Sequence, residues 1–149
     1  MNKKVVFGLL IIALSFLVIA GCATSPAPEP APEPAPAPTR PDGLILDGAG
    51  NYTVVRGDTL ADIAARRYGE SNMYYFPLIR LANANVVSDP DVIEVETVLV
   101  IPDLQRNLND AGAARLVRAD ILAVAGQYDR QSKPNAAERL RNLASRISQ

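Results

Sequence analysis

Eight of the twelve prolines in this 149-residue chain lie between Ser25 and Pro41, where Ala-Pro-Glu-Pro at positions 27–30 is repeated at 31–34. Proline fixes φ, lacks a backbone N–H donor and disfavours helix in the residue before it. The stretch also has no large apolar side chain, so it cannot form a core. We expect a disordered tether of extended, polyproline II type. Folding is then left to roughly a hundred residues, enough for about one domain.

The first 21 residues have the three parts of a secretory signal. Lys3 and Lys4 supply positive charge, and an uncharged apolar run extends from Val5 to Ala20. A membrane-spanning helix is the alternative, but the run falls short of the roughly 20 residues that a span needs. The run leads into Ile19-Ala20-Gly21-Cys22, which resembles the bacterial lipobox. The resemblance implies cleavage before Cys22 and attachment of fatty acyl chains to that residue.

This resemblance also implies where the protein is held. One acyl chain anchors only marginally, whereas the two or three chains typical of such lipoproteins hold a protein on the membrane. In enteric bacteria an Asp after the lipidated Cys favours the inner membrane. The residue here is Ala23, so we expect the outer membrane, facing the periplasm. Between Cys22 and Gly50 the tether would reach at most about 90 Å, at about 3.1 Å per residue.

Histidine is absent and cysteine occurs once. This composition excludes His-based acid–base catalysis, Cys–His nucleophile pairs, Cys/His zinc sites and an internal disulfide. The formal net charge of −1 provides no global field that would attract nucleic acid. We therefore expect no cofactor, no metal site and no nucleic-acid partner.

The segment after the tether begins with signals for a strand and a helix. Tyr52–Val55 is rich in β-forming residues and is followed by the turn signal Arg56-Gly57. Thr59 and Asp62 have the form of a capping box for a helix with apolar residues at helical spacing. Gly69 suits the position just past the end of that helix.

A second helix and a second strand follow. The helix is predicted over about 76–84, with Pro77 in its first turn. A break at 88–91 precedes Val98–Ile101, which is typical of a buried strand and is ended by Pro102. The predicted order is strand, helix, helix, strand.

These motifs, in this order, resemble the LysM domain over about residues 51–103, a third of the chain. The family usually has Gly where Glu96 stands, three residues after Ile93. Because Gly commonly serves a turn that needs positive φ, Glu96 implies a different turn or some strain. The matching segments are Tyr52-Thr-Val-Val-Arg-Gly57-Asp58-Thr59-Leu60, Ile63-Ala64, Tyr68-Gly69, Leu81-Ala82-Asn83, Asp89-Pro90-Asp91-Val92-Ile93 and Leu99-Val100-Ile101-Pro102.

The resemblance implies binding of glycans that contain N-acetylglucosamine, chiefly peptidoglycan or chitin, in a shallow groove between two loops. An acetylated amino sugar needs an amide partner and an apolar seat, which backbone groups with Leu60 or Val87 could give. Several positions also have structural interpretations: Leu60 and Ile93 as core, Thr59 as a helix cap, Asp58 as a turn residue, and both asparagines as helix-end and turn residues. Carried over, one wall is Gly57, Asp58, Thr59 and Leu60, and the other is Asn83, Asn85, Val86, Val87 and Ile93.

The C-terminal segment, residues 104–149, is predicted to form a helical hairpin broken at 131–134. Its apolar faces comprise Val117, Ile121, Val124 and Tyr128, then Leu140, Leu143 and Ile147, and Asn135 with Glu138 resembles a capping box. Eight bases against four acids give this segment a net charge of +4, whereas residues 51–103 have four against eight, net −4. We expect the hairpin to dock on the preceding domain; the alternatives are a coiled coil with a partner protein, or an anionic target. Leu44–Leu46 is too short to assign and could pair as an edge strand.

The sequence therefore predicts an α+β chain with four parts: a signal peptide (1–21), a lipidated Cys with its linker (22–50), a LysM domain (51–103) and a C-terminal helical hairpin (104–149). The predicted function is non-catalytic binding of peptidoglycan by a membrane-anchored lipoprotein. The alternative is an envelope assembly or scaffold protein whose segment 104–149 binds an envelope protein. A glycan hydrolase is disfavoured. Carboxylate pairs exist at Asp89/Asp91 and Glu94/Glu96, but no second domain could place two carboxyls across a cleft.

Overall fold

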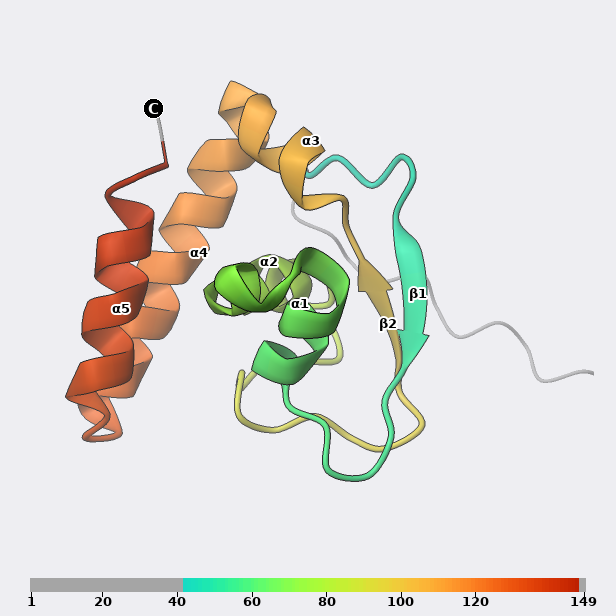
Figure 1. Cartoon of the computed structure of the whole chain (residues 1–149), viewed down its shortest axis with the longest axis horizontal. Helices are drawn as coiled ribbons and strands as arrows, with labels where there is room; N and C mark the ends of the chain where they lie inside the picture. Colours follow the sequence, from blue (N-terminus) through green and yellow to red (C-terminus); the bar gives the residue numbers. More distant parts are fainter. Residues whose placement is uncertain (1–41, 148–149) are drawn as a thin grey trace, which may run out of the picture. The chain divides into compact units, whose positions relative to one another are not determined.

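The computed structural model describes residues 42–147 (Figure 1). The predicted signal peptide, the lipidation at Cys22 and the tether up to residue 41 lie outside the described residues. No helix among the described residues is long and apolar enough to cross a membrane. The α+β class, with helices following a small two-stranded unit, is confirmed. In chain order the described elements are β1 (Gly50–Thr53), α1 (Leu60–Tyr68), the 3₁₀ helix η1 (Glu70–Tyr75), α2 (Phe76–Ala82), β2 (Val98–Ile101), α3 (Leu104–Asn109), α4 (Ala111–Arg130) and α5 (Pro134–Ala144).

The two strands form an antiparallel pair with Tyr52 opposite Leu99. Side chains alternate along β2, so that Leu99 and Ile101 are buried while Val98 is exposed. The bounds of β2 are those predicted, whereas β1 begins two residues before the predicted strand. Val54 continues the pairing beyond β1, because its amide donates to the carbonyl just before β2.

The first helix begins and ends where the sequence predicts. The Thr59 hydroxyl oxygen accepts from the Asp62 amide at 3.1 Å and its hydroxyl donates to the Asp62 carboxylate at 2.7 Å. Gly69 ends α1 at a φ of 94°, which favours glycine. The 3₁₀ helix that follows was not predicted. α2 has Pro77 in its first turn and ends at Ala82, two residues before the predicted end.

Two buried asparagines, Asn83 and Asn107, hold extended segments by the same three hydrogen bonds. The side-chain amide of Asn83 donates to the carbonyl four residues earlier and exchanges two bonds with the backbone of Val100, at 2.7 and 2.9 Å. Asn107 repeats the pattern with Ile45, at 2.8 and 3.0 Å. Leu44–Leu46 therefore forms no strand: an amide side chain of α3 takes the place of a neighbouring strand. This contact also places residues 42–50, which the sequence assigns to the linker, against the C-terminal helices.

The C-terminal helices bury their apolar faces against each other and against α2. Figure 1 shows α4 and α5 lying side by side. Val117, Ile121 and Val124 of α4 are buried, and so is Leu140 of α5. The predicted docking is thus observed, with α3 as an additional short helix. The predicted capping box at the start of α5 is wrong, because Lys133 is the cap residue and makes no side-chain capping bond. Pro134 instead starts α5 with its φ already fixed.

One buried ion pair joins α2 to α4. Arg80 donates to Asp120 through Nε at 3.1 Å and through a second bond from Nη2. The Asp120 side chain is only 6 % exposed. Burial raises the pKa of Asp120, and the Arg80 guanidinium opposes that rise. The ion pair therefore connects the LysM-like segment to the C-terminal helices, and the buried Asp120 carboxylate needs Arg80 to stay ionised.

Candidate functional site

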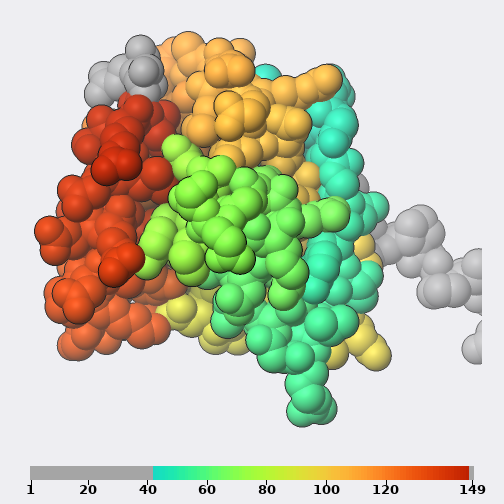
Figure 2. Space-filling model, viewed as in Figure 1, coloured from blue at the N-terminus to red at the C-terminus, as the bar shows by residue number. Residues whose placement is uncertain are grey.

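Two loops meet at one end of the molecule (Figure 1). They lie beyond the last residue pair of the sheet, in which Thr53 of β1 is opposite Val98 of β2. The first runs from Val54 to Thr59, and the second joins α2 to β2. Backbone hydrogen bonds tie them together at the strands, including one from the Glu96 amide to the Val54 carbonyl at 2.8 Å. The first loop projects from the body of the molecule at the bottom of Figure 2. These are the two loops that the sequence assigns to glycan binding.

The first loop is shaped by the carboxylate of Asp58. One oxygen accepts from the Tyr52 hydroxyl at 2.8 Å and from the Val55 amide at 2.9 Å. The other oxygen accepts from Arg66 at 2.5 Å, and the Asp58 side chain is 5 % exposed. Burial alone would raise the pKa of Asp58, but these hydrogen bonds outweigh it and lower the pKa below its ordinary value. The Asp58 carboxylate therefore stabilises the conformation of the first loop through hydrogen bonds within the protein.

The turn at Glu96 retains the conformation that glycine would adopt. Glu96 has a φ of 70°, in the left-handed region. A residue with a β-carbon pays roughly 1–2 kcal/mol there. Of the two possibilities at Glu96, a different turn or a strained one, the structure therefore has the strained turn. The strain persists because the Glu96 amide is fixed by its bond to Val54.

The nine predicted glycan-binding residues differ in what they present to solvent. Gly57, Thr59, Asn85 and Val86 are exposed, whereas Asp58 and Ile93 are partly buried. Leu60, Asn83 and Val87 are each only 1 % exposed. The side chains of those three belong to the core and the Asn83 network, so they are not available to a ligand in this structure. The glycan-binding role of the set stays a prediction.

Exposed valines supply the apolar surface that sequence reasoning assigned to Leu60 or Val87. Val55, in the first loop, is 55 % exposed, and Val86, in the second, is 52 % exposed. Alternation along the first strand, with Val54 inward, was the signal that could have revealed Val55. Exposed apolar side chains that lie together are a common feature of binding surfaces. Five of the six exposed large apolar residues among those described lie in the two loops or at the first residue of β2: Val55, Val86, Val92, Val95 and Val98.

The C-terminal hairpin supports the second loop from one side. Asp91 accepts from the Tyr128 hydroxyl at 2.8 Å and from Lys133 Nζ at 2.6 Å. Burial and the neighbouring Asp91 carboxylate raise the pKa of Tyr128, so its hydroxyl keeps the proton that it donates. Within residues 42–147, no hydrogen bond from the hairpin reaches the first loop. The hydrogen bonds of the hairpin therefore fix the second loop and not the first.

A surface hollow of about 410 Å³ lies at the other end of the sheet, against α1 and α3. It is lined in part by Gly50, Arg67 and Asp103, and by none of the predicted glycan-binding residues. This hollow is therefore separate from the two loops of the candidate site. No group of three or more His, Cys, Asp or Glu side chains in the described part could hold a metal ion.

Comparison with known proteins places this two-loop site within a recognised module. A LysM domain is detected at residues 52–102. Two curated relatives from Mycobacterium tuberculosis, Esterase MT1326 and Esterase Rv1288, are each 52 % identical to the chain over 58 residues. The match covers 39 % of this chain but 12 % of each relative, so the chain spans about an eighth of their length. No solved structure matches the chain significantly.

The segment shared with the two esterases is the LysM domain. The likeness to them therefore supports binding and does not carry an esterase activity over to this chain. A LysM domain implies binding of peptidoglycan or related glycans in general. Both loops of the candidate site lie within it.

Proposed function

We propose that this protein is a membrane-anchored lipoprotein that binds peptidoglycan non-catalytically through its single LysM domain. The observation that carries the proposal is that both loops of the LysM domain present exposed valines, Val55 on the first and Val86, Val92 and Val95 on the second. These side chains offer an apolar seat for acetyl groups, beside backbone groups that Gly57 leaves uncovered, since nothing lies within 4 Å of where its β-carbon would stand. A shallow site binds weakly, and tethering to the membrane compensates by raising the effective concentration. Docking of the C-terminal helices leaves little apolar surface for the alternative role of scaffold.

Replacing Val86 with aspartate is expected to weaken binding to purified peptidoglycan about tenfold, which is about 1.4 kcal/mol. The change removes apolar contact and places a carboxylate where the ligand would exclude water. Sedimentation of the protein with insoluble peptidoglycan over a concentration series measures the affinity. Leu122→Asp is the matched control, because Leu122 is an exposed apolar residue of α4. A wild-type protein that stays in the supernatant at every concentration, or one that releases soluble sugar fragments, would contradict non-catalytic binding.

The anchor is tested by the chemistry of Cys22. We expect the mature protein to begin at Cys22 and to incorporate labelled fatty acid, and the Cys22→Ala variant to retain residues 1–21 without label. Two or three chains, at about 0.8 kcal/mol per buried CH₂, would hold the protein on the membrane. Intact-mass spectrometry and metabolic labelling of cells provide the measurement. An unlabelled wild-type protein that retains residues 1–21 would favour a membrane-spanning segment instead.

A further inference from the structure

Most cations of the C-terminal segment already have partners. Lys133 pairs with Asp91 and Arg141 with Asp129. Arg106, Arg115 and Arg118 donate to backbone carbonyls. Among the described residues, Arg130 forms neither an ion pair nor a hydrogen bond with the protein, and the same holds for the two arginines Arg139 and Arg146. Part of the positive charge of this segment is therefore not neutralised by docking.

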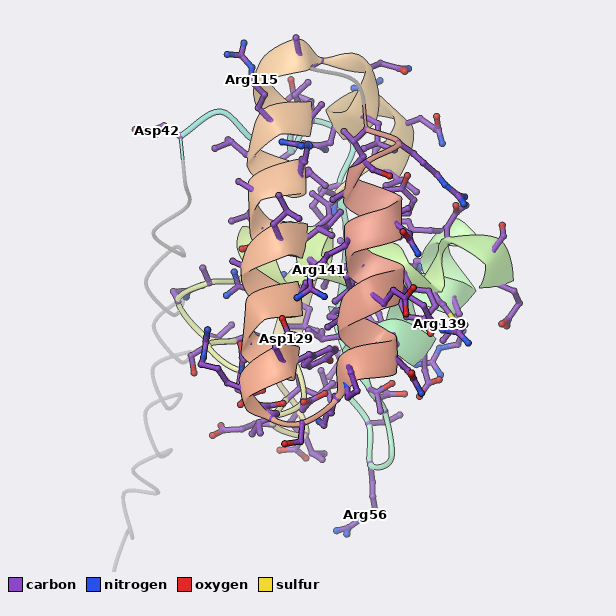
Figure 3. The ribbon with its side chains drawn as sticks, turned by 90° about the vertical axis from the view of Figure 1, so that its left-hand side faces the viewer. Asp42, Arg56, Arg115, Asp129, Arg139 and Arg141 are labelled. Atoms are coloured by element: carbon purple, nitrogen blue, oxygen red, sulfur yellow. The ribbon has the colours of Figure 1, made fainter. Side chains whose placement is uncertain are left out.

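These two arginines line one hollow of about 270 Å³ between η1 and α5. No Asp or Glu lines it; the other residues are Ser71, Tyr74, Asn142 and Leu143. Arg139 points away from the Arg141–Asp129 pair (Figure 3), and its guanidinium carbon lies 5.6 Å from the centroid of the Tyr74 ring. This cation–π contact holds one guanidinium in place before any ligand arrives. Arg146 exerts its charge nearby, since it opposes the rise that burial causes in the pKa of Tyr75.

We propose that this hollow binds a carboxylate of the peptide stems of peptidoglycan, so that the protein contacts both the glycan and the peptide of one polymer. The inference rests on the proposed function and deepens it. Guanidinium groups match carboxylates in bidentate geometry, and the Asn142 amide and Ser71 hydroxyl add donors. Tyr74 and Leu143 provide an apolar wall for a short aliphatic side chain next to the carboxylate.

The separation between the hollow and the two loops suits one ligand. α1 starts at the first loop and ends at Gly69, directly before η1. Its nine residues span about 14 Å at about 1.5 Å per residue. An extended peptide rises about 3.3 Å per residue, so a stem of about four residues covers this distance. A stem of that length is therefore long enough to run from a glycan on the first loop to η1, which forms one wall of the hollow.

The test compares intact peptidoglycan with the same material after an amidase has removed the peptide stems. With full-length Arg139→Gln/Arg146→Gln protein in detergent, we expect about tenfold weaker binding to intact peptidoglycan. Binding to the stripped glycan should equal that of wild type. Arg115→Gln/Arg130→Gln is the matched control: it removes the same charge from two exposed arginines of α4 that do not line the hollow, and should bind both materials like wild type.

Three results would overturn the inference: wild-type affinity of the Arg139/Arg146 variant for intact peptidoglycan, an equal loss in the control variant, or an equal loss on stripped glycan. Phosphatidylglycerol vesicles separate a lipid phosphate from a stem carboxylate. If the variant loses vesicle binding alone, the ligand is a lipid and the proposal is wrong. If wild type fails to bind the stripped glycan, the proposed function itself is wrong. If wild type binds the stripped glycan and the Arg139/Arg146 variant binds intact peptidoglycan as tightly as wild type, only this inference is wrong.

Discussion

Replacing Arg80 with methionine is expected to lower the free energy of unfolding by about 3–5 kcal/mol at neutral pH. Methionine preserves much of the apolar stem but removes both donors to Asp120, whose side chain is 6 % exposed. The carboxylate would then be buried without its counter-charge, and α2 would lose its ionic connection to α4. Urea denaturation followed by circular dichroism measures the change.

The deficit of Arg80→Met should shrink as the pH falls from about 7 to about 4. Burial raises the pKa of Asp120 above its ordinary 3.8, and Arg80 limits the rise. A carboxyl whose pKa is raised by folding contributes stability that is complete below the unfolded pKa and is lost as the pH rises through the folded pKa. Because the variant lacks the opposing guanidinium, its stability falls more than that of wild type over this range. A deficit that is constant with pH would contradict this account.

Two further variants separate the ion pair from simple packing. Arg80→Met/Asp120→Leu, which removes both charges, should lie within about 1 kcal/mol of wild type or be more stable, because a buried ion pair costs desolvation. Arg141→Met breaks the pair with Asp129 on the hairpin surface, where the side chains are 48 % and 42 % exposed. That exposed pair should be worth less than about 1 kcal/mol. Equal losses in Arg80→Met and Arg141→Met would show that burial of Asp120 does not matter.

The sequence predicted accurately those features that depend on neighbouring residues, such as helix caps and the ends of helices and strands. Thr59 caps α1 through a residue only three positions away, and Gly69 ends the helix by its own conformation. β2 is a short apolar run stopped by a proline, so its bounds follow from adjacent residues. The docked C-terminal helices follow from apolar residues at helical spacing, which must be covered.

Features that depend on distant partners were not predictable in the same way. Leu44–Leu46 has the composition of a strand, but its backbone is satisfied by Asn107, 62 positions from Ile45. The start of α5 was misassigned because Asn135 and Glu138 fit a local capping pattern, whereas the cap residue is Lys133, two residues earlier. η1 has no apolar periodicity, and none of its residues is buried.

In the candidate site, too, the sequence predicted the location of the loops but not the contacts of their side chains. The resemblance identified both loops, yet it could not distinguish side chains that face the ligand from those that hold the loops. Leu60 and Val87 lie in the core, while Val55 and Val92 face solvent. The sequence motifs identify the loop positions, but only the burial of each residue shows whether its side chain faces the core or the solvent.

Asn83→Asp is expected to lower the free energy of unfolding by about 3 kcal/mol or more at neutral pH. The amide nitrogen of Asn83 lies 2.7 Å from two carbonyl oxygens, those of Ile79 and Val100. A carboxylate oxygen in its place would face both carbonyls without a donor, in a position that is 1 % exposed. The bond to the Val100 carbonyl, one of the two that tie Asn83 to β2, would be lost. The second loop of the candidate site lies between α2 and β2. Thermal and urea unfolding of the variant measure the loss.

Asn85→Asp is the matched control, because it makes the same chemical change two residues away at an exposed position. It should alter stability by less than about 0.5 kcal/mol. If Asn83 is structural, Asn83→Asp loses stability, and peptidoglycan binding falls only as far as the folded fraction does. A ligand role makes the opposite prediction: both variants would be equally stable, and Asn83→Asp alone would bind weakly when fully folded. The second outcome would contradict the structural role, because three hydrogen bonds inside the core cannot be exchanged for a buried charge without a loss of stability.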